Sequence, residues 1–296
     1  MINTRHVPII RLGASLLLLA SASQSHAFEW SDTYIGYRWG SQFREPSNTQ
    51  DIKKNLFSLT HADGYKYGSN FFTVDMLLSD SKDPASGAFQ GAQPGGAQEV
   101  FVVYRHTLSF GKVSGTPFKF GPVRDAGAVL GFDFSSKNDD FGARVRRPLG
   151  GLSLSLDVPG FWNVGLLYQH ENNHNGIVPL IGSPPGMTSN VTFKNTWRLE
   201  TSWEIPFSAG LPAKFKGFAN YIAPKGKDGF GADTKAELLT EIAVMFDIGS
   251  LAGQKDTFLA GAGYQYWKNK FGNNASLDAT GGSTAKVPQV LLEVHF

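Results

Sequence analysis

A strict alternation of apolar and polar residues recurs along this chain, and it limits the possible folds more than any other feature. The clearest example is VTFKNTWRLETSWEI at 191–205. Its odd positions are mainly aromatic or aliphatic, among them Trp197, Leu199 and Trp203, whereas every even position is polar. Because successive side chains of an extended strand point to opposite faces, period 2 predicts a strand with one apolar face and one polar face.

Eleven further segments show versions of this pattern. They are 32–40, 52–61, 68–79, 99–110, 125–135, 143–156, 160–171, 213–223, 235–247, 256–267 and 287–296. Strands of this length exceed the ~5–6 residues typical of soluble sheets and suit tilted strands that cross a bilayer. A sheet in lipid must close, because an open edge leaves backbone groups without hydrogen bonds. The sequence therefore predicts an all-β protein, a single antiparallel transmembrane β-barrel of about 12 strands over residues 28–296.

The end of the chain, VPQVLLEVHF, continues the alternation to its last residue. Termini usually fray unless they are paired, so we expect the last strand to close the barrel against the first. A terminal aromatic residue, Phe296, resembles the assembly signal of outer-membrane proteins, which implies the barrel-assembly machinery as a partner. Long links at 80–98, 172–190 and 268–286 are predicted on the external side, and short links such as 157–160 and 207–212 in the periplasm. The link at 111–124 is longer than this rule expects.

Residues 1–27 have the features of a secretory signal peptide: Arg5 and Arg11, the apolar stretch LGASLLLLASA, and small residues before a cleavage site after Ala27. Its removal lowers Lys+Arg from 27 to 25, which balances the 25 Asp+Glu residues. Without a basic excess, a nucleic-acid partner loses its main support. The chain has no cysteine, which excludes disulfides and thiolate metal sites. These features predict an exported protein of the bacterial outer membrane, with membrane lipid around it.

The segment HENNH at 170–174 matches the zinc-protease pattern. That chemistry needs a helix, which brings both histidines to one face with the glutamate as general base. Here a strand runs into loop residues, so we expect an external loop and no metal site. Ser109 and His106 lie on opposite faces of one strand and cannot form a nucleophile–base pair. A barrel-embedded hydrolase remains an alternative, because catalytic groups can assemble across strands.

Charged side chains on the predicted lumen parity are the more informative candidates. In one interpretation, these charges pair with one another across a narrow lumen and have a structural role. In the other, they line a pore and select the solute that passes. Aromatic faces can stack on flat heterocycles, while amides and charges bind polar edges. Outward aromatic residues are explained as interfacial girdles. These are Tyr37, Trp39, Trp197, Trp203, Tyr264 and Tyr266.

Several segments resemble the nucleoside-specific (Tsx-like) family of outer-membrane porins: NFFTVDMLLSDSKDPA (70–85), EVFVVYRHTLSF (99–110), FKFGPVRD (118–125) and the terminal strand. The resemblance implies a twelve-strand barrel with a narrow, nucleoside-selective passage. Passive diffusion down a gradient would need no cofactor. We expect a passive channel for small hydrophilic solutes, with nucleosides as the leading candidate. The alternative is a structural or adhesion barrel whose lumen is plugged by side-chain pairs. The predicted pore-lining residues are Phe71, Asp75, Glu99, Phe101, Arg105, Arg198, Glu200 and Asn220.

Overall fold

The computed structural model describes residues 28–85, 95–139 and 141–296. Long strands dominate this part of the chain. The twelve that build the main sheet are β1 (Trp30–Phe43), β2 (Ile52–Tyr65), β3 (Gly68–Ser79), β4 (Gln98–Ser109), β5 (Val123–Lys137), β6 (Arg146–Leu156), β7 (Phe161–Gln169), β10 (Thr196–Ser208), β11 (Pro212–Ile222), β12 (Glu237–Asp247), β13 (Phe258–Lys268) and β14 (Thr284–His295). The predicted signal peptide at 1–27 lies outside the described residues.

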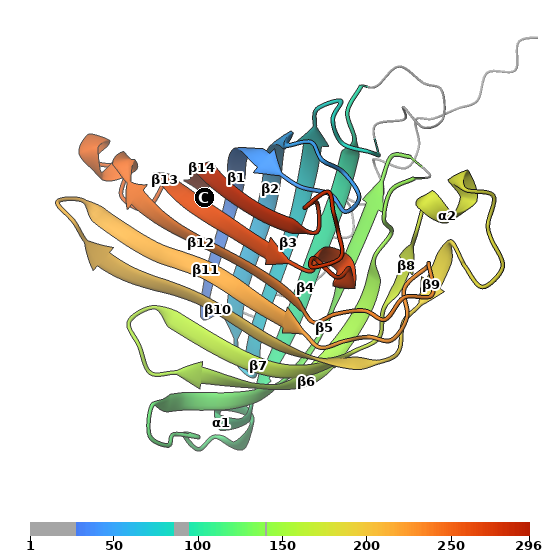
Figure 1. The fold of residues 1–296 in the computed structure, drawn as a ribbon. Coiled ribbons are helices and arrows are strands. Elements are labelled where there is room, and N and C mark those ends of the chain that lie inside the picture. The colour runs from blue at the N-terminus through green and yellow to red at the C-terminus, as the bar shows by residue number, and fades with distance from the viewer. Residues whose placement is uncertain (1–27, 86–94, 140) are drawn as a thin grey trace, which may run out of the picture.

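The sheet closes on itself into a barrel (Figure 1). Neighbouring strands pair antiparallel around the ring, β14 pairs with β1, and β5 pairs with β6. The backbone N–H of Phe296 donates to the carbonyl of Thr33 at 2.9 Å, so pairing continues to the last residue. The predicted twelve-strand antiparallel barrel, closed by its terminal strand, is confirmed.

The two faces of the barrel wall differ in the way the alternation predicts. In β14, Val290, Leu292 and Val294 are exposed on the outside, whereas Val287, Gln289, Leu291 and Glu293 are buried toward the inside. Exposed outward residues of other strands are also large and apolar, such as Leu130, Leu166 and Leu199. A closed antiparallel barrel with an apolar exterior is the form that spans the bacterial outer membrane, and the protein is located there.

The links are longer at one end of the barrel than at the other. One end carries the start of β1, the C-terminus and the short links, together with α1 (Phe110–Ser114) and η3 (Ile248–Ala252). The other end, called the mouth here, carries the longer links, with β8 (Asn172–His174), α2 (Ile177–Leu180), β9 (Asn190–Thr192) and η4 (Lys270–Gly272). Figure 1 shows α1 and α2 at opposite ends. No helix in the described ranges is both long and apolar enough to cross a membrane.

The prediction of one strand over 191–205 is wrong at its beginning. The structure divides this segment into β9 and β10, and residues 193–195 belong to neither strand. Val191 and Phe193 continue the alternation in sequence, yet both are buried. The physical reason is pairing: β9 pairs with β8 in a hairpin at the mouth, which meets the barrel wall through the single β6–β8 pair Arg146–Asn172. The Phe193 ring then packs beneath the Lys225 ammonium group.

Candidate solute pathway

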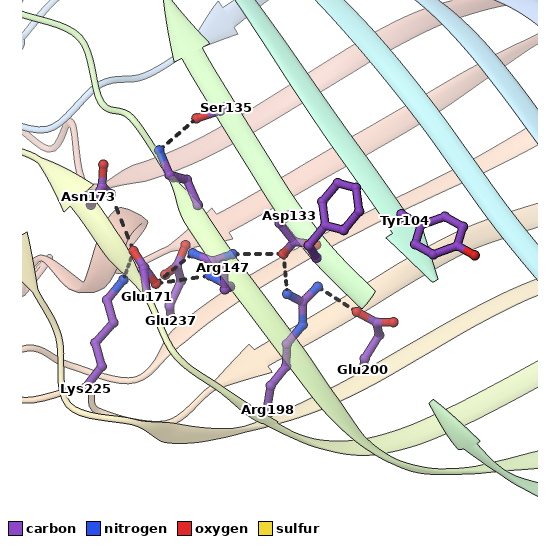
Figure 2. Close-up of polar contacts among 12 residues, drawn as sticks. Tyr104, Asp133, Ser135, Arg147, Glu171, Asn173, Arg198, Glu200, Lys225 and Glu237 are labelled. Atoms are coloured by element: carbon purple, nitrogen blue, oxygen red, sulfur yellow. Dashed lines mark hydrogen bonds and ion pairs between the residues drawn. The ribbon is translucent and has the colours of Figure 1, made fainter. Parts of the chain in front are cut away.

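A connected series of charged side chains lies inside the barrel and is called the lumen ladder here; Figure 2 labels all of its members except Arg105. Its members alternate in sign along most of its length, from the mouth toward the centre of the barrel. They are Lys225, Glu171, Arg147, Asp133, Arg198, Glu200 and Arg105. Strands β4, β5, β6 and β10 supply five of them, and two mouth links supply Lys225 and Glu171. With four basic and three acidic groups, the ladder has a formal charge of +1.

Asp133 is the centre of the ladder. Its carboxylate lies 2.8 Å from Arg105 Nη2, 2.6 Å from Arg198 Nη1 and 3.1 Å from Arg147 Nη1. Only 2% of the residue is exposed. A carboxylate removed from water in this way is tolerated only when counter-charges and hydrogen bonds compensate it. Three guanidinium groups provide that compensation and tie strands β4, β6 and β10 to β5.

Besides its contact with Asp133 on the adjacent strand, Arg105 reaches further across the inner wall. It binds Glu200 through two parallel contacts, Nε to Oε1 at 2.9 Å and Nη2 to Oε2 at 2.8 Å. Strands β5, β6 and β7 separate their strands, β4 and β10, around the ring. Gly131 is the register partner of Arg105, and a Cβ there would lie 3.0 Å from Arg105 Cδ and 2.2 Å from the Tyr104 carbonyl oxygen. A glycine at this position therefore lets the arginine lie flat over β5.

A second lumen cluster lies on the part of the ring formed by β1, β3, β12 and β13. Arg38 Nη2 donates to Asp75 Oδ2 at 2.8 Å, and Arg38 Nη1 donates to Glu241. Gln265 Nε2 donates to the other Glu241 oxygen at 3.1 Å. The two Arg38 contacts again join strands that are not neighbours, so charge pairing braces both halves of the inner wall.

The eight predicted pore-lining residues all lie on inward-facing positions, but they divide between these groups. Arg105, Arg198 and Glu200 belong to the lumen ladder, and Asp75 belongs to the second cluster. The remaining four are placed by their register partners. Phe71 pairs with Arg105, Phe101 with Asp75, Asn220 with Glu200, and Glu99 lies near the mouth, 3.8 Å from Lys137. Their role as solute contacts stays a prediction.

The sequence-based selection missed four residues that organise both groups: Arg38, Asp133, Arg147 and Glu171. Arg38 and Asp133 stand at the alternating positions of their strands that face the lumen. A selection of every charged residue at such positions would have included them. Arg147 lies next to the Pro148–Gly150 interruption that obscures the strand pattern. Glu171 follows the end of β7, where the alternation of inward and outward side chains no longer applies.

Glu171 is the glutamate of HENNH, and its surroundings explain its role. The carboxylate accepts hydrogen bonds from Arg147 at 2.9 Å and from Lys225 at 2.7 Å. Although burial opposes ionisation, these two cations lower the pKa of Glu171 to about 2. The segment forms no helix: residues 172–174 are the short strand β8. Within the described part of the chain, no group of three or more His, Asp or Glu side chains is arranged to hold a metal ion.

Charges also gather at the mouth, in a set called the mouth cluster: Glu45, Lys54, Asp83, Lys137 and Lys270. Glu45 lies 2.9 Å from Lys54, 3.1 Å from Lys270 and 3.5 Å from Lys137. Burial opposes its ionisation, but the three lysines hold the pKa of Glu45 well below its usual range. Burial also lowers the pKa of Lys270 to about 8. The cluster ties the links after β1, β3 and β13 to the inner wall at β2 and β5.

Comparison of the chain with models of known protein families gave no match. Comparison with curated proteins gave no match either. Among solved structures, the KdgM porin is similar with a TM-score of 0.43 and 10% identity, over 89% of this chain and 99% of that one. The translocator domain of the autotransporter NalP from Neisseria meningitidis gives a TM-score of 0.42 and 12% identity, over 95% and 92% of the two chains. The NanC porin gives 0.41 and 10%, over 90% and 99%.

Proposed function

We propose that this barrel is a non-enzymatic outer-membrane channel through which small hydrophilic solutes diffuse passively, with nucleosides as the leading candidate. Movement follows the solute gradient and needs no cofactor. Contacts along the lumen must be weak enough to release the solute again.

The exposure of Phe71 carries this proposal. The residue lies on the inward parity of β3, beside the buried Arg105, yet 39% of it is exposed. A phenyl ring inside a closed barrel has this exposure only where other side chains leave the lumen beside it unfilled. Neighbouring inward positions such as Thr73 and Asn220 are also partly exposed. These observations support a water-accessible passage between the two charge groups.

The lining of that passage supports a nucleoside as the solute. An exposed phenyl ring offers a stacking face for a base. Arg105 and Glu200 lie beside it, and charged or amide groups can bind the polar edges of a base or the hydroxyl groups of ribose. The resemblance of segments 70–85, 99–110 and 118–125 to the Tsx-like family supports the same choice.

Planar-bilayer recording of the refolded protein tests the proposal. We expect small open channels whose conductance falls in a saturable way when nucleosides are added, at concentrations where free ribose has no effect. Open channels whose conductance does not change with nucleosides would support the proposed passage but contradict its specificity for nucleosides. Well-folded barrels without conductance would instead support a plugged barrel, for which the Arg105–Glu200 contact is the favouring observation.

Replacing Arg198 with alanine is expected to change ion selectivity while the barrel still assembles. Asp133 keeps Arg105 and Arg147 as partners, and Glu200 keeps Arg105, so no acid is left unpaired. The ladder loses its net positive charge, and the reversal potential in a KCl gradient should shift toward cation selectivity.

Arg124→Ala is the matched control. Arg124 is an exposed arginine of β5, and its substitution removes the same charge at a site outside the ladder. A reversal potential of Arg198→Ala equal to that of this control would show that the ladder does not influence permeating ions.

A further inference from the structure

A cavity of about 120 Å³ lies at the mouth, where several links converge. Four phenyl rings from four separate segments line it: Phe141, Phe193, Phe230 and Phe271. Glu45 and Lys137 of the mouth cluster line it as well. By the measure in which a single water needs roughly 10–15 Å³, this volume takes a group of about ten waters, or a compact ring system. We call it the mouth cavity.

Two of the rings are already held on one face by ammonium groups. Lys225 Nζ lies 4.2 Å from the centre of the Phe193 ring, and Lys270 Nζ lies 5.2 Å from the centre of the Phe271 ring. Both lysines are fixed in turn by buried acids, Glu171 and Glu45. The ammonium group therefore fixes the orientation of each ring and occupies one of its faces, so a ligand can stack only from the opposite side.

Phe271 occupies a backbone conformation that phenylalanine normally avoids. Its φ of 60° and ψ of 14° lie in the left-handed region, which favours glycine and asparagine. The ring packs edge-on against Trp267, with centroids 5.3 Å apart. Glycine would adopt this turn without strain, so the backbone does not require the phenyl group. Strain of this kind concentrates at ligand sites, and the ring here points to a binding role.

Two amides beside the rings retain unused hydrogen-bonding groups. Asn175 accepts through Oδ1 from the backbone N–H groups of Ile177 and Val178, while its Nδ2 donates to no group in the described ranges. Asn273 donates through Nδ2 to the Lys270 carbonyl, while its Oδ1 accepts from no group in the same ranges. Both residues line the cavity. It therefore offers one free donor and one free acceptor beside its stacking faces.

We propose that the mouth cavity is a binding site for a flat, uncharged heterocycle, and that it is where a nucleoside base first binds on its way into the channel. The base stacks against phenyl rings that line the cavity, and its polar edge meets Asn175 and Asn273. The charges of the mouth cluster are paired with one another, which favours a neutral ligand over a charged one. This site rests on the proposed channel function for its place in transport, but its occupancy does not depend on conduction.

Phe271→Gly is the decisive variant, because it removes a ring and suits the left-handed backbone, so the turn should fold without strain. Adenosine binding to the refolded barrel in detergent is measured by isothermal titration calorimetry, with ribose as the comparison ligand. Base–aromatic stacking corresponds to roughly a 5-fold to 150-fold change in affinity. We expect a loss in this range for Phe271→Gly and much weaker binding of ribose than of adenosine.

Asp256→Gly is the matched control. Asp256 also has a left-handed backbone, with φ of 57°, and lies in the link at the opposite end of the barrel. Its substitution should leave adenosine binding unchanged. Unaltered affinity in Phe271→Gly, no binding to the wild-type protein, or equal binding of ribose would each overturn the site.

Conductance separates this proposal from the channel function. Adenosine binding that depends on Phe271, in barrels that do not conduct, would support the site and reject the channel. Conductance that adenosine blocks equally in wild type and Phe271→Gly would reject the site and retain the channel.

Discussion

Substituting Asp133 with asparagine is expected to destabilise the barrel by about 3–5 kcal/mol, the usual cost of breaking a buried ion pair from one side. Asparagine keeps the size of the side chain but removes the charge that three arginines share. Arg105 and Arg198 retain Glu200, and Arg147 retains Glu171, so the wall gains a net excess of buried positive charge. Urea unfolding of the refolded protein in lipid vesicles, followed by tryptophan fluorescence, measures the loss.

Asp233→Asn is the control for this prediction. Asp233 pairs with Lys227 at 2.7 Å, but its side chain is 80% exposed and that of the lysine 61%. An exposed pair contributes little to stability, so this variant should unfold near the wild-type urea concentration. The double variant Asp133→Asn with Arg198→Ala should recover part of the loss, because it removes one unpaired cation. Equal unfolding of Asp133→Asn and Asp233→Asn would mean that the ladder does not hold the wall together.

The barrel could be predicted from sequence because each strand carries its own evidence. In β14 the alternation alone assigns Val290 and Leu292 to lipid and Gln289 and Glu293 to the lumen, since adjacent side chains must take opposite faces. This argument needs no knowledge of the partner strand. It also fails locally, as at Val191 and Phe193, where the alternation continues but the strand leaves the barrel wall.

The charge partners could not be predicted in the same way. Parity placed Arg105 and Glu200 in the lumen, but their contact joins β4 to β10 and depends on the stagger of all the strands between them. A one-residue shift in any of those registers would reverse the faces of one strand. Glu45, Glu171 and Lys225 lie in links, where no periodicity marks which side chains turn inward.

Glu45→Gln is expected to loosen the links at the mouth. Glu45 is 4% exposed and touches three lysines. Its neutralisation leaves Asp83 to balance Lys54, and Asp83 with Glu99 to balance Lys137. Lys270 keeps its hydrogen bond to the Arg44 carbonyl but loses its only carboxylate contact within the described residues. If about 3 kcal/mol of local stability is lost, amide hydrogen exchange in 44–51 and 269–283 should accelerate roughly 100-fold.

The pH dependence of the wild-type protein provides an independent check with a defined sign. The pKa of Glu45 is lowered in the folded protein, so its contribution is present above the unfolded pKa of about 4.3 and is lost as pH falls through the lower folded value. Exchange in the mouth links, corrected for the intrinsic pH effect, should therefore stay slow from pH 7 to pH 5 and rise only in strong acid. Glu29→Gln removes an exposed partner of Lys112 at the opposite end and should leave the mouth unchanged. Slow exchange in Glu45→Gln at neutral pH would show that the three lysines do not depend on this carboxylate and that other contacts close the mouth.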